Sequence, residues 1–148
     1  MNDGEFDDYI KERYEKYLKY YDKRATHNKF WNDACSIYIL LISVAIAPIL
    51  TIDLLFKGSG VVWAMVLSPT VALVAGIKTH KRFYENWLNY RRTWDNLQHE
   101  HYWKKASANV YKDAKDKNVL FVERVENLIA EEGSSWMACH KDKESKNS

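Results

Sequence analysis

Two long apolar runs interrupt an otherwise polar chain. The 22 residues from Cys35 to Phe56 carry one charge, Asp53, and the 17 residues from Val61 to Ile77 carry none. A hydrocarbon core about 30 Å thick is crossed by roughly 20 helical residues. The pattern therefore predicts two transmembrane helices, at 34–56 and 61–77. The alternative, a buried helix pair in a soluble bundle, rarely contains two adjacent runs with so little charge.

The polar flanks repeat apolar and aromatic residues with the 4-3 spacing of amphipathic helices. We expect one such helix at 1–33 and another at 78–108, each continuous with its span and lying beside the other. The repeating residues are Ile10, Tyr14, Tyr17, Tyr21, Arg24, Asn28 and Trp31, then Phe83, Trp87, Tyr90, Trp94, Leu97 and His101. We expect a further helix at 109–132, whose apolar stretch is "VLFVERVENLIAEE", and a mostly disordered tail at the polar residues 133–148.

These elements predict an all-α membrane protein. The predicted fold is a two-transmembrane helical hairpin with long cytoplasmic helical arms and a C-terminal helix that packs back on them. Basic residues crowd the arms next to both spans, whereas the turn at 57–60 carries Lys57 alone. The positive-inside rule places both termini in the cytoplasm. The first apolar run lies too far along the chain for a signal peptide, so we expect both spans to be retained.

Charge and short motifs exclude several functions. The net charge is only +2 and bases alternate with acids, which argues against a nucleic-acid partner. Cys35 and Cys139 lack metal-ligand spacing and are expected to be free thiols, and His99 and His101 point to different faces of a helix. The chain has no nucleophile elbow, phosphate loop or metalloprotease motif. We therefore expect no enzyme activity, no cofactor and no metal.

Small residues and prolines mark the spans. A stripe of small residues lets two helices approach closely in lipid, either within one hairpin or between subunits. In the second span small residues recur at every fourth position: Ala64, Ser68, Ala72 and Gly76. The first span has a shorter stripe of the same kind: Ser43, Ala47 and Thr51. Pro48 and Pro69 fall inside the spans, where each is expected to bend its helix.

A charge within a span requires an explanation, because burying a carboxylate in lipid is costly. Asp53 either pairs with Lys57 one turn later or forms an outer ring of carboxylates around a pore. One hairpin cannot enclose a water-filled path, so a pore needs a homo-oligomer. The candidate polar lining is Ser43, Thr51, Ser68 and Thr70, and the candidate inner mouth is Lys78, His80, Lys81 and Arg82.

The whole pattern, from Tyr9 to Trp136, resembles the SLATT family of bacterial two-transmembrane domains. The resemblance is strongest in "NWLNYRRTWDNLQHEHYW" and "VYKDAKDKNVLFVERVENLIAEEGSSW". The spaced residues that carry it are Trp87, Arg91, Leu97, Glu100, Tyr111, Phe121, Glu126, Glu131 and Trp136.

The resemblance implies a homo-oligomeric channel or pore-forming effector in the bacterial inner membrane, encoded beside nucleotide-signalling defence partners or linked to a stress system. It also implies a trigger, which we expect to be a cytoplasmic protein, a small ligand or the membrane lipid itself. A different function stays open on the sequence: a non-conducting, membrane-anchored interaction protein whose helical arms recruit a partner.

Overall fold

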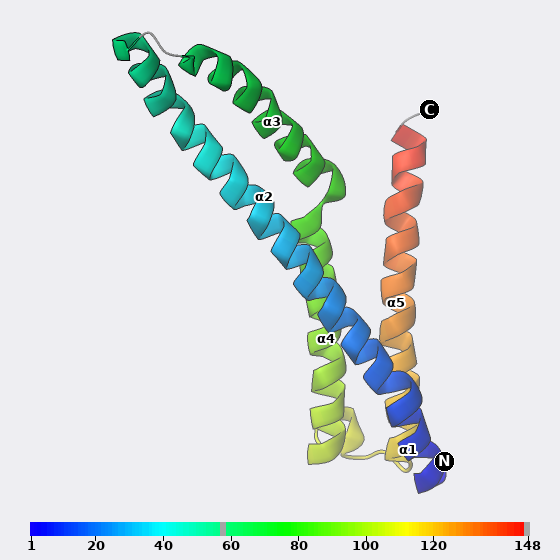
Figure 1. Ribbon diagram of the computed structural model, residues 1–148. Helices are drawn as coiled ribbons and strands as arrows, with labels where there is room; N and C mark the ends of the chain where they lie inside the picture. The colour runs from blue at the N-terminus through cyan, green and yellow to red at the C-terminus, as the bar shows by residue number, and fades with distance from the viewer. Residues whose placement is uncertain (57–58, 147–148) are drawn as a thin grey trace. The chain divides into compact units, whose positions relative to one another are not determined.

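The part of the chain that the structure describes forms helices joined by short turns and contains no strand. The computed structural model describes the backbone of residues 1–56 and 59–146, and the side chains of residues 1–52 and 59–133. Its elements are α1 (Asp3–Tyr9), the π-helix η1 (Ile10–Tyr14), α2 (Glu15–Phe56), α3 (Gly60–Lys81), α4 (Phe83–Ala106), the 3₁₀ turn η2 (Asn109–Tyr111) and α5 (Lys117–Lys146) (Figure 1). The predicted helical class and the two long apolar helices are confirmed.

The chain divides into two compact units. One comprises residues 1–25 and 88–148, and we call it the arm unit; the other comprises residues 26–87, and we call it the span unit. The helix α2 contributes its first part to the arm unit and the rest to the span unit.

The arm unit has a core of large, mostly aromatic side chains. Residues from η1, α2, α4, η2 and α5 are buried together: Tyr14, Tyr21, Leu97, Tyr111, Phe121 and Val125. Phe121 meets three other rings edge-on, Tyr14 at 5.4 Å, Phe6 at 5.7 Å and His101 at 6.2 Å between ring centroids. Burying an aromatic side chain contributes more than any other residue type to such a core, so Phe121 is central to its stability.

The start of α5 differs from the prediction of a helix over 109–132. The backbone turns at Ser107 and Asn109, which have positive φ angles of 51° and 54°, and α5 begins only at Lys117. The carboxylate of Asp116 accepts hydrogen bonds from the backbone N–H groups of Asn118 (2.9 Å) and Val119 (3.1 Å). This is the cap that a helix N-terminus requires, and it fixes the first turn.

The end of α5 also differs, because the helix continues to Lys146 through the predicted disordered tail. Gly133 lies inside the helix, where glycine costs about 1 kcal/mol relative to alanine but does not end it. The residues that follow include Met, Ala, Lys and Glu, which have high helix propensity.

The predicted continuity of arm and span holds for α2 but not between α3 and α4. Arg82 adopts the left-handed conformation, with φ 50° and ψ 42°, and ends α3. Its N–H donates to the Lys78 carbonyl (3.2 Å), while the Asn86 side-chain amide donates to the Lys81 carbonyl (3.0 Å). A non-glycine residue rarely takes this conformation, so these bonds hold a defined break rather than a continuous helix.

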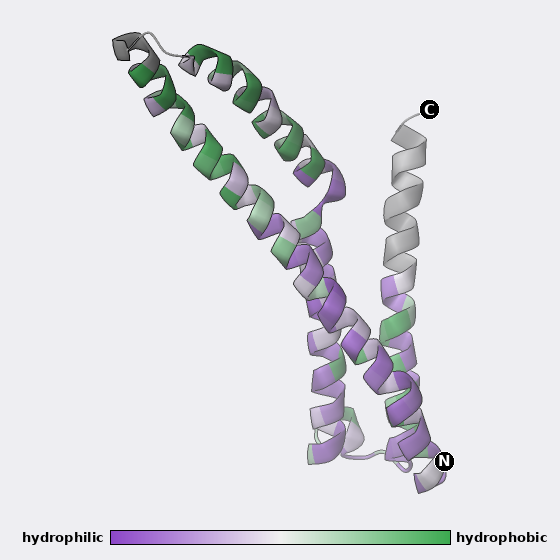
Figure 2. Ribbon diagram, in the orientation of Figure 1, coloured by the Kyte–Doolittle hydropathy of each residue, from purple (hydrophilic) through white to green (hydrophobic). Residues whose placement is uncertain are grey.

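The span unit carries its apolar residues on the outside. Figure 2 shows apolar residues along α3 and the later part of α2, and only 6% of each apolar window is buried. Leu40, Val44, Met65 and Leu73 are each more than 60% exposed. A core helix of a soluble protein would be mostly buried, so this exposure favours a lipid environment over the soluble bundle.

Candidate functional site

The helices α2 and α3 meet along one face each. The half-buried residues recur at helical spacing: Cys35, Ile39, Ile42, Ile46 and Ile49 on α2, and Ala64, Leu67, Val71, Val74 and Lys78 on α3. Two polar contacts join these helices. The Tyr38 hydroxyl bonds the Thr70 hydroxyl (2.9 Å), and the Lys78 ammonium donates to the Ser36 hydroxyl (2.7 Å).

The small-residue stripes lie mostly away from this contact. Ser68, Ala72 and Gly76 are exposed, and a methyl group placed on Gly76 would meet no atom within 4 Å. Ala64 is half-buried, unlike the other three positions of this stripe. The shorter stripe of Ser43, Ala47 and Thr51 is exposed as well. Within the chain, therefore, the two stripes do not pack against each other, and both present a close-approach surface.

Both prolines share that outward exposure. The helices continue past Pro48 and Pro69, and both rings are exposed. Proline has no N–H, so the carbonyls of Val44 and Met65, four residues earlier, lose their usual helical donor. In lipid such carbonyls require satisfaction from neighbouring protein, from water or from a local change in the helix.

The predicted polar lining separates into two groups. Ser43, Thr51 and Ser68 are exposed, and the Thr51 hydroxyl donates back to the Ala47 carbonyl (3.0 Å). Thr70 is instead half-buried against Tyr38 and also donates to the Leu67 carbonyl (2.7 Å). The Asp53 side chain and Lys57 lie outside the described residues, so the choice between an ion pair and a carboxylate ring stays open.

The predicted inner-mouth cations separate in the same way. Lys78 is held between the helices by Ser36, whereas His80 and Lys81 are exposed. Arg82 is exposed but forms an ion pair with Glu85, 2.5 Å away. Among the described side chains, His80 and Lys81 are therefore the members of this set that form no hydrogen bond or ion pair.

A buried carboxylate that sequence reasoning did not assign a role lies in the arm unit. Glu100 on α4 is 3% exposed and accepts hydrogen bonds from the Tyr111 hydroxyl and from Nε of Arg124 on α5, each 2.8 Å long. A second bond from Arg124 Nη2 makes the ion pair bidentate. Burial, then the neighbouring carboxylate, raises the pKa of Tyr111, and the hydrogen bond to Glu100 raises the pKa of Arg124. This network joins α4, η2 and α5.

A second carboxylate joins α5 to the first helices. Glu126 accepts hydrogen bonds from the Tyr9 hydroxyl (2.8 Å) and from the guanidinium of Arg13, whose Nη2 lies 2.7 Å away. The Arg13 hydrogen bond is the main cause that holds the pKa of Glu126 below its usual value. Both members of the pair are partly exposed, so the bond is open to competition from other anions.

The residues that carried the family resemblance are largely structural. Leu97, Tyr111 and Phe121 form part of the buried core, while Glu100 and Glu126 hold the two ion pairs. The residues of the family resemblance therefore included the carboxylate of each network, Glu100 and Glu126. They did not include the arginine partners, Arg124 and Arg13. Among the described residues, no group of three His, Cys, Asp or Glu side chains could hold a metal ion.

Comparison with known proteins gives a family match. A family model described as "SMODS and SLOG-associating 2TM effector domain 1" matches residues 9–136, which cover most of the arms, both apolar helices and the start of the tail. No curated protein and no solved structure matches the chain.

Proposed function

Because the chain belongs to the SLATT family of two-transmembrane effector domains, we propose that it is a homo-oligomeric channel or pore-forming effector of the bacterial inner membrane. In this proposal α2 and α3 form a transmembrane hairpin whose turn at 57–60 is extracytoplasmic, while the arm unit and both termini are cytoplasmic. The family description supports the membrane-effector role. The proposed link to a defence or stress system follows the same resemblance.

The observation that carries the proposal is the exposed small-residue face of the span unit. Ser68, Ala72 and Gly76 are available to a second copy because they do not pack on α2. Small residues are a main source of helix association in lipid, where apolar burial provides no driving force. A symmetric ring of hairpins packed through these faces would enclose a path that one hairpin cannot.

Side chains of the span unit have distinct roles in this arrangement. Ser43, Thr51 and Ser68 provide exposed hydroxyl groups for a polar lining. Thr70 and Lys78 hold α2 against α3 rather than line the path. Asp53 contributes to the outer mouth, and His80 and Lys81 contribute to the inner mouth together with the Arg82–Glu85 pair.

The test is electrical recording from purified protein in planar lipid bilayers, under a salt gradient that reports conductance and ion preference together. We expect discrete openings that depend on the protein. Gly76→Leu should prevent assembly and abolish the openings, because a large side chain then separates the helices. The matched control is Val66→Leu, which adds bulk to an exposed position on another face of α3.

Two outcomes would contradict the proposal. Wild-type assembly and conductance in Gly76→Leu would remove the stripe from the interface. Electrical silence from verified, oriented oligomers would favour the anchored interaction protein, in which the arms recruit a partner and the spans act as a tether.

Asp53 is tested separately. Asp53→Asn removes the carboxylate but keeps its size, so a carboxylate ring predicts a reversal potential shifted toward lower cation preference. An unchanged reversal potential would assign Asp53 to the pair with Lys57.

A further inference from the structure

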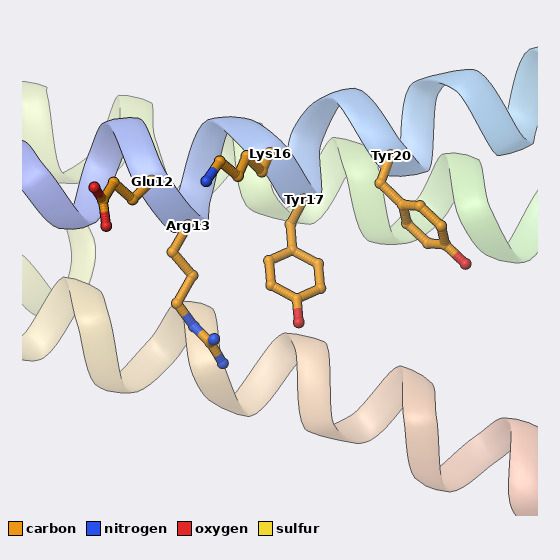
Figure 3. A pocket seen from close by; sticks show the side chains of 5 residues that line it. All are labelled: Glu12, Arg13, Lys16, Tyr17 and Tyr20. Carbon is orange, nitrogen blue, oxygen red and sulfur yellow. The ribbon is translucent and has the colours of Figure 1, made fainter.

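A hollow on the arm unit offers a ligand neither a free ring face nor a pair of converging cations. It encloses about 490 Å³, and one helical stretch alone lines it: Glu12, Arg13, Lys16, Tyr17 and Tyr20 (Figure 3). Arg13 and Lys16 extend in different directions in this view. The Arg13 guanidinium covers the Tyr17 ring at 5.4 Å, and the Arg24 guanidinium covers the Tyr20 ring at 5.3 Å. The groups that remain available to a ligand lie in the span unit.

Lys78 is a half-buried cation between α2 and α3. Its ammonium donates to the Ser36 hydroxyl (2.7 Å), and that hydroxyl donates in turn to the Asn32 carbonyl (2.7 Å). An ammonium has three N–H donors, so two remain after the bond to Ser36. Among the side chains that the structure describes, no carboxylate forms an ion pair with Lys78. Partial burial of a charge beside a neutral hydroxyl is costly unless an anion completes its contacts.

The length of the second apolar run places Lys78 at the edge of the hydrocarbon. The 17 residues from Val61 to Ile77 rise about 26 Å as a helix, slightly less than the roughly 30 Å of the hydrocarbon core. Lys78 follows this run directly, so its ammonium lies where the phospholipid headgroups begin. Trp31 and Tyr84, nearby in sequence on α2 and α4, are 45% and 56% exposed, as is typical of aromatic residues at headgroup depth.

The charges at this end of the span unit favour an anionic partner. Lys29 and Lys81 are exposed and, like Lys78, form no ion pair among the described side chains. Arg82 is balanced by Glu85, 2.5 Å away. Cations next to the membrane attract anionic lipid. The other formal charges in residues 26–36 and 76–87 are three cations and one carboxylate: Lys29, Lys78, Lys81 and Asp33.

We propose that Lys78 binds the phosphate of an anionic phospholipid at the seam between α2 and α3. Ser36 positions the ammonium, and its two remaining N–H groups donate to the phosphate oxygens. The acyl chains lie against exposed apolar side chains of α3 such as Leu73 and Ile77. The site therefore takes an amphipathic ligand, because the cation holds the phosphate and the span holds the chains.

The bound lipid also stabilises the contact between the two helices. Ser36 and Lys78 come from different helices, so a ligand that requires both in place favours the packed pair. The site rests on the transmembrane hairpin of the proposed function, but not on assembly or conduction.

The experiment is native mass spectrometry of the full chain released from nanodiscs that contain equal amounts of phosphatidylglycerol and phosphatidylcholine with the same acyl chains. We expect bound phosphatidylglycerol to exceed bound phosphatidylcholine by about tenfold, because only the first carries a net negative charge. Lys78→Gln should reduce this preference to about twofold. The matched control Lys81→Gln removes the same charge from an exposed position on the same helix, and should lower the preference by no more than about twofold.

Two further variants test the geometry of the site. Ser36→Ala removes the hydroxyl that positions Lys78, so the preference should fall several-fold although no charge is lost. Lys78→Arg keeps a cation with N–H donors and should retain at least about half of the preference. Retention in Lys78→Arg separates loss of the phosphate contact from loss of the fold.

Equal losses in Lys78→Gln and Lys81→Gln would indicate diffuse attraction and overturn the proposal. So would an unchanged preference in Ser36→Ala, a complete loss in Lys78→Arg, or equal retention of both lipids by the wild type. Excess inorganic phosphate lacks acyl chains and should leave the bound lipid in place; displacement would assign the site to a soluble anion instead. A chain that does not enter nanodiscs would overturn both the site and the transmembrane hairpin, whereas an electrically silent chain that retains the lipid would overturn the channel alone.

Discussion

The arm unit and the span unit are both built from helices, but the arm unit buries its large apolar side chains and the span unit exposes many of its own. In the arm unit, large rings such as Tyr21 and Phe121 are buried, and the charged residues lie outside or in specific pairs. In the span unit, Leu40, Met65 and Leu73 face outward, so apolar side chains cover the outside of the helices as well as the contact between them. The two units therefore do not share a source of stability.

The difference reflects the solvent of each unit. In water, burying apolar area drives helices together at about 25 cal/mol per Å². In lipid that driving force is absent, and association depends on close packing of small residues and on polar bonds such as Tyr38 to Thr70. Substitutions of equal size should therefore have unequal effects in the two units.

The largest expected effect is in the arm-unit core. Phe121→Ala removes a fully buried ring and should destabilise the unit by about 3–5 kcal/mol. The matched change Phe30→Ala, at a ring 64% exposed in the span unit, should leave the arm unit unaffected. Native-state hydrogen exchange of α4 and α5 amides measures both. If the α4 and α5 amides exchanged at equal rates in the two variants, the buried ring would matter no more than the exposed one, and the prediction would be wrong.

The buried ion pair should give the next largest effect. Glu100→Gln keeps the shape of the side chain but leaves Arg124 without its partner charge, and should cost about 2 kcal/mol. This is less than for a fully buried pair, because the Arg124 side chain is 36% exposed. The same exchange experiment detects the loss on α4 and α5. A stability equal to wild type would show that the surrounding core alone holds these helices.

A smaller effect is expected between the spans. Tyr38→Phe removes the hydroxyl that bonds Thr70 and should destabilise the α2–α3 contact by about 0.6 kcal/mol, the average for such bonds in membranes. Tyr84→Phe, at an exposed tyrosine of α4, serves as the control for loss of a hydroxyl. Reversible unfolding in mixed detergent, followed by circular dichroism, compares the two. A larger loss in Tyr84→Phe would refute the assignment.

The smallest effect concerns pH. The pKa of Glu126 is lowered in the folded protein, so the Arg13–Glu126 bond stabilises it above the unfolded value of about 4.3 and is lost as pH falls through the folded value. Since both side chains are partly exposed, Glu126→Gln should cost only about 0.5 kcal/mol at neutral pH. Hydrogen exchange of α5 at neutral and acid pH should show this difference vanishing in acid. A difference that grows in acid would have the wrong sign.

Sequence patterns were most reliable where the period and length of a run decide the outcome. The apolar runs predicted the later part of α2 and α3, and the 4-3 repeats predicted helices on both flanks. Helix boundaries were less reliable. The cap at Asp116 and the left-handed Arg82 depend on backbone turns that no periodic pattern encodes, and the continuation of α5 past Gly133 opposed the polar composition.

The sequence predicted which residues make up the candidate site, but not which neighbour each side chain meets. The sequence identified the stripe through Gly76 and the hydroxyl groups of both spans, but a stripe alone does not tell which neighbour it meets. Thr70 and Ser68 lie two residues apart in similar surroundings, yet Thr70 bonds Tyr38 and Ser68 is exposed. That distinction depends on the rotation of α3 against α2, which the packing of the two helices decides.

The sequence by itself determined the family, the helical class and the two stretches able to cross a bilayer, because hydropathy and period are properties of local segments. The tertiary structure decided which residues meet: Glu100 with Arg124, Glu126 with Arg13, and Lys78 with Ser36. These partners lie 24 to 113 residues apart along the chain. Only the folded backbone brings such groups within hydrogen-bonding distance, so no local pattern could specify them.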